Sequence, residues 1–156
     1  MVMYEEEFRQ ISQLIEKLNR EANAKVCYLV DKNGQLIASA GETNQIDGTS
    51  LASLTAGNIA ATGGLAKLLG EREFSILFHE GEKDNIHISL VGQRVILVVI
   101  FDTRSSLGLV RLRVKRVAQE LDSIFQSLVR KAETPGGGQS PFAEITDQDI
   151  DNLFQD

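Results

Sequence analysis

The sequence predicts an α/β protein of the α+β kind, with a five-stranded, mainly antiparallel sheet and helices on both of its faces. Three observations support this fold class. Three long segments have helical periodicity, and the short apolar segments between them are mostly joined by tight turns. One of those segments, VILVVIFD at 95–102, is apolar at every position but the last, so a strand there must be covered on both faces. The predicted order of elements is therefore α-β-β-α-β-β-β-α.

The chain begins with a predicted amphipathic helix at residues 4–22, followed by a β-hairpin. The apolar stripe of the helix comprises Tyr4, Phe8, Ile11, Ile15, Leu18 and Ala22, with Leu14 beside it. The hairpin is predicted over Lys25–Ser39, because Asn33 and Gly34 stand between two apolar runs. An Asn-Gly pair in that setting is the strongest short-range hairpin signal.

A central helix is predicted over Asp47–Glu71, and Gly70 is a suitable C-terminal stop for it. The stripe predicted to face the core is Leu51, Leu54, Asn58, Ala61, Leu65 and Leu68. The opposite stripe is made of small residues, namely Ala52, Ala56, Ala60, Gly63 and Gly64, and ends at Lys67. An interior helical glycine costs about 1 kcal/mol relative to alanine, so a close neighbour should benefit from the missing side chains. That neighbour is either the protein or its own dimer, or a separate partner.

Three strands and a long helix follow. In 73–79, Phe74, Ile76 and Phe78 alternate with other residues, as in a strand. Because this strand follows the helical excursion and lacks Pro or Lys, it is predicted to be a sheet edge that pairs with a second copy in a homodimer. The next strand carries Ile86, Ile88 and Leu90 in alternation.

The last long helix is predicted to begin near Ser105. Its apolar positions keep an alternating spacing of three and four, which suits packing on a sheet and beside another helix. These positions are Leu107, Val110, Val114, Val117, Leu121, Ile124 and Leu128. We expect the central helix to cover one face of the sheet and the two outer helices to cover the other.

Composition divides the chain into a domain at 1–132, a Gly/Pro linker at 133–141 and an acidic amphipathic segment at 142–156. Thr146 and Asp149 resemble a capping box at the start of a short helix. The predicted anchors of this segment are Phe142, Ile145, Ile150, Leu153 and Phe154. The segment is therefore interpreted as a tethered docking peptide that binds a groove on a partner, with a solubilising tail as the alternative.

Charge and cysteine content exclude several classes of protein. Residues 1–132 hold all 16 Lys and Arg against 16 acidic residues, and the remaining 24 residues add six acidic ones, which gives the net charge of −6. An acidic tail argues against nucleic acid or an anionic membrane as the main partner. A single cysteine and the lack of an apolar run of membrane-spanning length favour a cytoplasmic protein.

The sequence contains no recognisable catalytic or metal-binding motif. The glycine run Gly136–Gly138 lacks the lysine and the preceding strand of a phosphate-binding loop. His79, His87 and Cys27 have no metal-ligand spacing, and Cys27 sits in an apolar strand where an inert core role is expected. No metal and no cofactor are therefore predicted, and the chain is interpreted as a binding protein rather than an enzyme.

Two basic features admit a contact with a partner. The run Arg111, Arg113, Lys115 and Arg116 is interpreted as a solvated helix face, with an acidic partner surface as the alternative. Arg104, just after the apolar strand, has the side chain of an arginine finger, but nothing in the sequence distinguishes it for that role.

Several motifs together resemble the Roadblock/LC7 family. They are the VDKNGQLIASAG hairpin, SLASLTAGN followed by GGLAKLLGE, FHEG before two strands, and VILVVIFD with SSLGLVRLRVK. The Gly/Pro linker and the terminal PFAEITDQDIDNLF are similar to the bacterial members that regulate the Ras-like GTPase MglA. The resemblance covers nearly the whole chain.

The resemblance implies a homodimer that binds the GTP-bound form of an MglA-like small GTPase and accelerates GTP hydrolysis without an arginine finger. It also implies promotion of nucleotide exchange, with the terminal segment docking on the GTPase away from its nucleotide pocket. A role in cell polarity and gliding or surface motility, with concentration at a cell pole, follows from the same resemblance. The alternative is a non-activating Roadblock scaffold that recruits a GTPase or a motor component.

Overall fold

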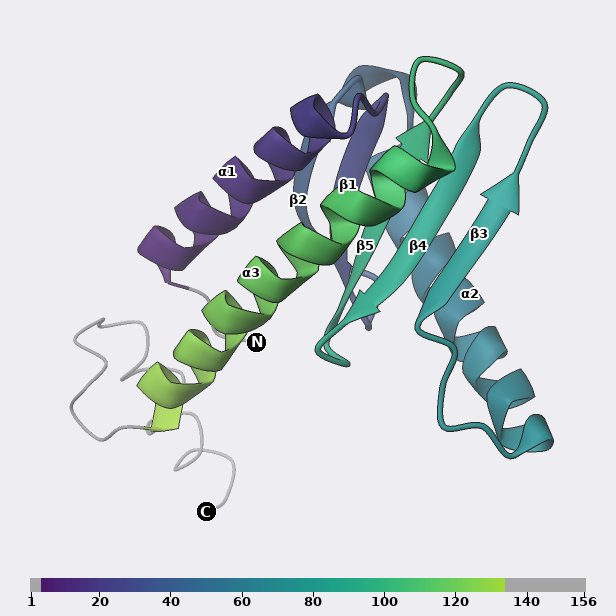
Figure 1. Ribbon diagram of the computed structural model, residues 1–156. Coiled ribbons are helices and arrows are strands. Elements are labelled where there is room, and N and C mark those ends of the chain that lie inside the picture. The colour runs from purple at the N-terminus through teal and green to yellow at the C-terminus, as the bar shows by residue number, and fades with distance from the viewer. Residues whose placement is uncertain (1–3, 134–156) are drawn as a thin grey trace.

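The computed structural model describes residues 4–133 of the 156-residue chain. A five-stranded sheet carries α1 and α3 on one face and α2 on the other (Figure 1). The elements are α1 (Glu5–Glu21), β1 (Val26–Asp31), β2 (Leu36–Gly41), α2 (Gly48–Leu69), β3 (Ile76–Glu80), β4 (Asn85–Val91), β5 (Val95–Phe101) and α3 (Leu107–Glu133), with a 3₁₀ turn at Thr43–Gln45. The predicted order of elements and the predicted fold class are confirmed.

The sheet is antiparallel throughout, in the order β2-β1-β5-β4-β3. Its central strand is β5, in which every residue is buried. Successive side chains of a strand point to opposite faces, so Leu97 packs toward α1 and α3 whereas Val98 packs toward α2. The continuous apolar run of β5 is thereby explained, and helices cover both faces as the sequence predicts.

Two hydrophobic cores result from this layering. The larger core lies between the sheet and the two outer helices, and its fully buried members include Ile11, Ile15, Leu29, Leu121 and Phe125. The smaller core lies between the sheet and α2, and includes Val26, Tyr28, Val30, Ile59 and Ile96. The described part of the chain contains no helix with both the length and the apolar character that crossing a bilayer requires.

The predicted stripe of α1 needs one correction, at Phe8. Its side chain is 46% exposed, whereas Glu7 is buried and forms an ion pair with Lys131 on α3 at 2.8 Å. Phe8 lies about 60° around the helix from Ile11, because each residue advances about 100°. The ridge that contacts α3 therefore passes through Glu7 and Ile11, and Phe8 is left on the flank.

The loops agree with the expected turn chemistry. Gly34 adopts φ +93° in the β1–β2 turn, and Gly70 adopts φ +75° at the C-terminal cap of α2. Both lie in the left-handed region that glycine tolerates. Strand β3 begins at Ile76 rather than at residue 73, so Phe74 precedes the strand that is predicted to contain it.

Asp47 caps the N-terminus of α2. Its Oδ1 accepts hydrogen bonds from the backbone N–H groups of Thr49 and Ser50, and its Oδ2 accepts one from the Ser50 hydroxyl. The hydrogen bonds from Ser50, followed by that from Thr49, lower the pKa of the Asp47 carboxyl. The ionised carboxylate is thus the form that the folded helix favours.

Replacing this cap should lower thermal stability in a pH-dependent way. A lowered folded pKa means that the contribution of Asp47 is complete above its unfolded pKa and is lost as pH falls through the folded pKa. We expect Asp47→Ala to lower Tm at neutral pH, and the difference from the wild type to become smaller in strong acid as the carboxylate is protonated. Melting curves across pH, with Asp47→Asn as the variant that keeps an uncharged acceptor, test this; a Tm difference that is the same above the unfolded pKa and below the folded pKa would contradict it.

Candidate functional site

The candidate site is built on α2, whose surface carries almost no charge. Between Gly48 and Leu69 the sole charged residue is Lys67. A helix that is apolar on all sides is normally covered on most of them, yet the sheet covers one face of α2. The residues buried on that face are Ala52, Thr55, Ile59 and Ala66.

Of the four leucines predicted to face the core, Leu51 is half-buried and packs against the smaller core, but the other three are exposed. Leu54, Leu65 and Leu68 are 74%, 57% and 83% exposed, and Ala61 is also exposed. At about 100° per residue, the buried face lies between the leucine stripe and the small-residue stripe, which therefore flank it on either side. Ala52 is predicted to belong to the exposed stripe, but it is fully buried against the sheet. The prediction failed because a helix without a polar face has no amphipathic signal to fix its rotation.

The β1–β2 hairpin approaches α2 closely beside Ser53 and Ala56. A Cβ at Gly34 would lie 3.5 Å from Ser53 Cα and 3.7 Å from Ala56 Cβ. Ala56 is half-buried and packs against the smaller core. One flank of α2 carries Ala56, Ala60, Gly63, Gly64 and Lys67, and we call it the small-residue flank. It therefore begins on the hairpin side of the molecule.

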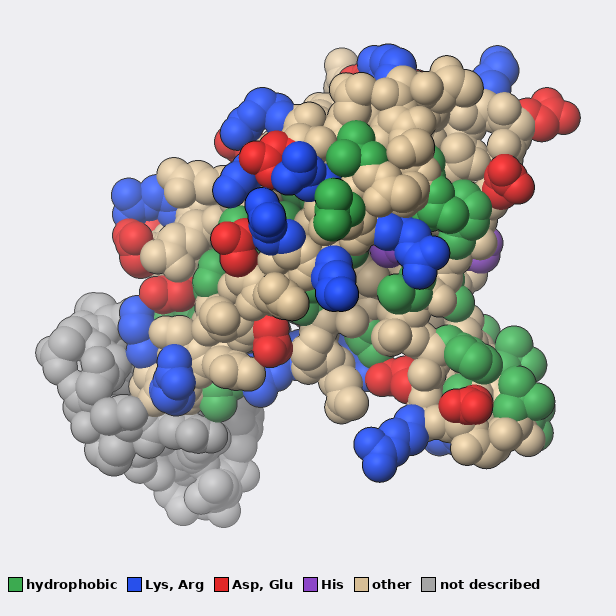
Figure 2. Space-filling model, viewed as in Figure 1, with side chains coloured by type: hydrophobic (Ala, Val, Ile, Leu, Met, Phe, Trp, Pro, Cys, Tyr) green, Lys and Arg blue, Asp and Glu red, His purple; other side chains and the backbone are tan. Residues whose placement is uncertain are grey.

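The opposite flank carries what we call the leucine surface, formed by Leu54, Leu65, Leu68 and Leu69. All four are more than half exposed, and hydrophobic side chains gather over the C-terminal end of α2 in the space-filling view (Figure 2). An apolar patch of this kind marks an interaction site more often than a free surface.

A pocket of 420 Å³ adjoins the leucine surface between α2 and strands β3 and β4. Leu54, Asn58, His79 and Ile86 are among its lining residues. Asn58 Oδ1 is buried and has no hydrogen-bond partner among the described residues. The leucine surface thus faces the β3 side of the molecule, away from the hairpin.

The small-residue flank continues through Ala60, Gly63, Gly64 and Lys67. Ala60, Gly64 and Lys67 are exposed and Gly63 is half-buried. A Cβ added at Gly63 or Gly64 would meet nothing within 4 Å. Close packing within the chain therefore does not require these glycines, and a neighbour outside the chain would account for them.

The Gly64→Ala substitution should raise the stability of the fold and weaken the binding of a partner. Alanine should stabilise α2 by up to about 1 kcal/mol, because the added methyl group meets no atom of the chain. If a partner backbone lies against Gly64, the same methyl group should weaken that contact. Denaturant unfolding and titration with the GTPase partner proposed below test both effects. Tighter or unchanged binding would contradict a close approach at this position.

Strand β3 forms one edge of the sheet, as the sequence predicts. Ile76 is 50% and Phe78 is 38% exposed, and the Phe78 ring stacks on Phe101 with centroids 6.2 Å apart. Phe74 is half-buried and lies just before the strand. The free edge and the leucine surface lie on the same side of the molecule.

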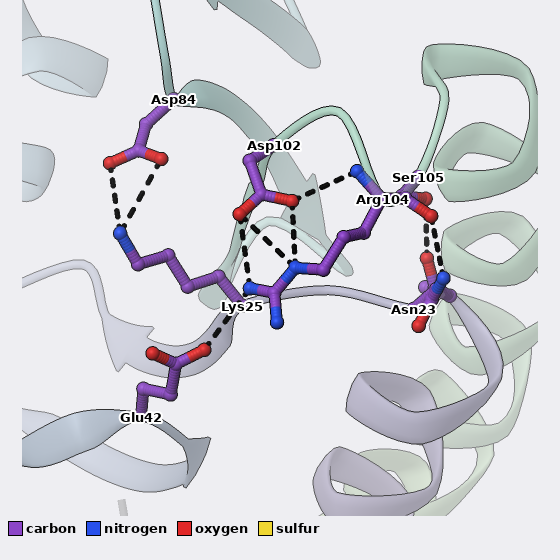
Figure 3. Close-up of polar contacts among 8 residues, drawn as sticks. Asn23, Lys25, Glu42, Asp84, Asp102, Arg104 and Ser105 are labelled. Carbon is purple, nitrogen blue, oxygen red and sulfur yellow. Dashed lines mark hydrogen bonds and ion pairs between the residues drawn. The ribbon is translucent and has the colours of Figure 1, made fainter.

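Arg104 is held by the chain's own carboxylates, as Figure 3 shows. Its Nε donates to Asp102 Oδ1 at 3.0 Å, and its Nη2 donates to Asp102 Oδ2 at 3.0 Å and to Glu42 Oε2 at 3.2 Å. These bonds raise the pKa of Arg104, and Arg104 in turn lowers the pKa of Asp102. Asn23 also donates to the Arg104 carbonyl oxygen. The guanidinium therefore connects the loop before α3 to the residue that follows β2. Because it is already engaged, it is poorly placed to insert into another protein.

Of the remaining reactive side chains, Cys27 lies in the core as the sequence predicts, whereas His87 is more deeply buried than expected. Cys27 is fully buried, and burial raises the pKa of its thiol to about 12. His79 is exposed, whereas His87 is buried. Within residues 4–133, no three His, Cys, Asp or Glu side chains lie where they could share a metal ion. The linker predicted at 133–141 begins at the last residue of α3, and its other residues, like the docking segment at 142–156, lie outside the described residues.

The fold and the sequence together define the class of this protein. The sequence profile of the Roadblock/LC7 domain matches residues 10–101, which runs from α1 to the end of β5. The chain belongs to the Roadblock/LC7 family. No curated protein sequence matches it significantly.

Within this family the chain is similar to structures of MglB. MglB of Myxococcus xanthus has 65% sequence identity and a TM-score of 0.78, with 82% of this chain and 96% of that chain covered. The gliding protein MglB of Thermus thermophilus has 33% identity and a TM-score of 0.75, with 81% and 96% covered. A structure described as MglB with a tetrameric arrangement has the same identity, TM-score and coverage.

Sequence reasoning missed the leucine surface as an exposed feature, although a signal for it was present. The stretch from Gly48 to Ala66 contains no charged residue, so no side of this helix was suited to water. That composition indicates a helix with neighbours on several sides, whichever stripe the sheet takes.

Proposed function

We propose that this chain is a homodimeric regulator of gliding or surface motility that stimulates GTP hydrolysis by an MglA-type small Ras-like GTPase. Its similarity to MglB of Myxococcus xanthus, at 65% identity over most of both chains, carries this proposal. The Thermus thermophilus MglB, a gliding protein, supports the link to motility. The exposed flanks of α2 supply an apolar surface on which such a partner could lie.

The proposed mechanism is a shift in the conformational population of the GTPase. Among the described residues no three His, Cys, Asp or Glu side chains could share a metal ion, and Arg104 is engaged by Asp102 and Glu42. Activation without a supplied catalytic group requires tighter binding of the hydrolysis-competent conformation than of the incompetent one. Only that difference in affinity accelerates hydrolysis, because equal binding of both conformations shifts nothing.

The homodimer is proposed to form through the free edge of β3. Phe74, Ile76 and Phe78 supply apolar contacts, and the unpaired backbone groups of β3 can extend the sheet into a second copy. Such pairing would bring the α2 helices of the two copies side by side. The leucine surface would then lie in the dimer seam, because it faces the β3 side of the molecule. The other flank, with Ala60, Gly63, Gly64 and Lys67, would remain open to the GTPase.

Single-turnover GTP hydrolysis by the MglA-like GTPase of the same organism tests the proposal. We expect a large acceleration when this protein is added to the GTP-loaded GTPase. A stable complex without acceleration would instead identify a recruiting scaffold. Absence of any complex with the GTP-bound form would overturn the partner assignment itself. Fluorescent nucleotide release in the same mixture measures the proposed promotion of exchange.

Deleting the residues after Pro135 should leave a folded dimer but weaken the action on the GTPase. The proposed anchors, Phe142, Ile145, Ile150, Leu153 and Phe154, would dock on the GTPase as one face of a short helix. We expect weaker binding or slower exchange, with the fold and the dimer retained. Titration and exchange assays against the full chain measure this, and equal values for both proteins would make the segment a solubilising tail.

A further inference from the structure

A second groove lies on the opposite face of the sheet from α2. It is a hollow of 690 Å³ between the N-terminal half of α3 and strands β3 and β4. We call it the α3–β4 groove and define it by Ile76, His87, Ser89, Arg111, Leu112 and Lys115. Its volume is in the range of ligand-binding sites. The proposed GTPase and dimer contacts on α2 do not use it, and of the apolar residues at the proposed β3 dimer edge it includes Ile76 alone.

The floor of the groove is polar and incompletely satisfied. His87 is 1% and Ser89 is 6% exposed, and neither the imidazole nitrogens nor the hydroxyl have a hydrogen-bond partner among the described residues. Buried polar groups normally have partners. Burial lowers the pKa of His87, and the positive charge of Arg111 lowers it further.

The rim of the groove is apolar and basic. Ile76 and Leu112 are 50% and 62% exposed, and Arg111 and Lys115 are exposed beside them. Lys and Arg side chains lie along α3 in the space-filling view (Figure 2). Asp122 supplies the one acidic group among the lining residues, at the end near Gly92. A groove of this composition fits a peptide that carries apolar and acidic side chains together.

We propose that the α3–β4 groove binds the chain's own C-terminal segment, residues 142–156. That segment contains five acidic residues and no basic one, together with Phe142, Ile145, Ile150, Leu153 and Phe154. Its carboxylates complement Arg111 and Lys115, and its apolar side chains complement Ile76 and Leu112. The acidic tail and two residues of the basic run on α3, Arg111 and Lys115, are then the two sides of one contact.

The length of the chain permits this docking. Helix α3 ends at Glu133, and Asp122 lies 11 residues earlier, which is about 17 Å along the helix axis. Residues 134–141 reach at most about 28 Å when extended, so residue 142 can return to the Asp122 end of the groove. From Asp122 to Arg111 is a further 17 Å or so, which is close to the length of a helix over Thr146–Phe154 with its flanking residues.

Docking in the groove would control the availability of the segment. A segment held against α3 cannot bind elsewhere at the same time, so the groove and an external partner compete for it. If that partner is the GTPase, its binding must release the segment, and this last consequence alone rests on the proposed function. The contact between the segment and the groove of its own chain does not rest on the proposed function.

Paramagnetic broadening in the full-length protein tests the docking. A nitroxide attached through Gln155→Cys marks the tail, and Cys27 escapes labelling because it is buried with a pKa raised to about 12. In the absence of any GTPase, we expect selective broadening of the backbone amide signals of Ser89, Leu112 and Lys115. The broadening should weaken as salt is added, because part of the attraction is electrostatic.

Matched variants identify the contact. Arg111→Glu with Lys115→Glu should abolish the broadening, and so should Ile150→Asp with Leu153→Asp in the tail. Arg116→Glu, on the same helix but outside the groove, should retain it. Broadening that survives both double variants, or that appears instead at Leu65 and Leu68, would overturn the proposal. Equal broadening in a mixture of spin-labelled and isotope-labelled chains would overturn docking within one chain.

Discussion

Ala60→Arg should abolish the acceleration of GTP hydrolysis that we propose for this protein. Ala60 is exposed on the small-residue flank of α2, two turns from the buried Ala52. A long charged side chain at this position would hold a partner away from the helix and would leave a charge buried in the interface. An uncompensated buried charge costs about 3 kcal/mol or more, which corresponds to roughly 100-fold weaker binding.

The same substitution should leave the fold intact, because position 60 points away from the sheet. Gln13→Arg, on the exposed surface of α1 across the sheet, is the matched control and should activate the GTPase normally. Single-turnover hydrolysis and co-elution measure both variants, with sedimentation to follow the dimer. Binding of Ala60→Arg at wild-type affinity would exclude this flank as the GTPase contact. Conversion of Ala60→Arg to a monomer would show that the small-residue flank is mainly a dimer seam.

The sequence was sufficient to predict the order of elements and the layers. Turn residues such as Asn33 and Gly34 mark their connections locally, and an apolar run such as Val95–Phe101 has one stable solution, a central strand covered on both faces. The rotation of an amphipathic helix can also be predicted from its sequence, because its apolar stripe packs on the core. In α3 the predicted positions Val110, Val114 and Leu121 are all buried.

The rotation of α2 could not be predicted from its sequence. Leu54 and Leu68 are larger and more apolar than Ala52 and Thr55, and a core would normally take the larger side chains. The structure nevertheless buries the smaller ones, and the β1–β2 hairpin lies close beside this end of the helix: a Cβ added at Gly34 would be 3.5 Å from Ser53 Cα. That distance is a property of the tertiary structure, and no local pattern encodes it.

The partner that each face of the candidate site contacts could not be predicted from the sequence either. Ala60, Gly63 and Gly64 form an unusual stripe in the sequence, and they remain predictions as contact residues. The leucines are predicted to face the core because a helix is usually judged on the assumption that one side meets water. A helix whose neighbours include other chains violates that assumption, so its sequence indicates that contacts exist but not which contact each face makes.

Leu68→Asp should convert the proposed dimer into a monomer. Leu68 is 83% exposed in the single chain, so its replacement removes no contact within the protomer and should not lower protomer stability. In a two-fold dimer each substitution occurs twice. Burying one leucine contributes about 1.5–3 kcal/mol, so the loss of two should raise the dimer Kd by roughly 100-fold or more.

Leu112→Asp is the matched control for this prediction. Leu112 is 62% exposed, but it lies on α3, across the sheet from the leucine surface. Sedimentation equilibrium over a range of concentrations should show a monomer for Leu68→Asp and a dimer for Leu112→Asp, with equal circular dichroism. A dimeric Leu68→Asp that no longer binds the GTPase would reverse the roles of the two flanks of α2. Because the flanks lie on opposite sides of the buried face, the Leu68→Asp and Ala60→Arg variants together assign one partner to each.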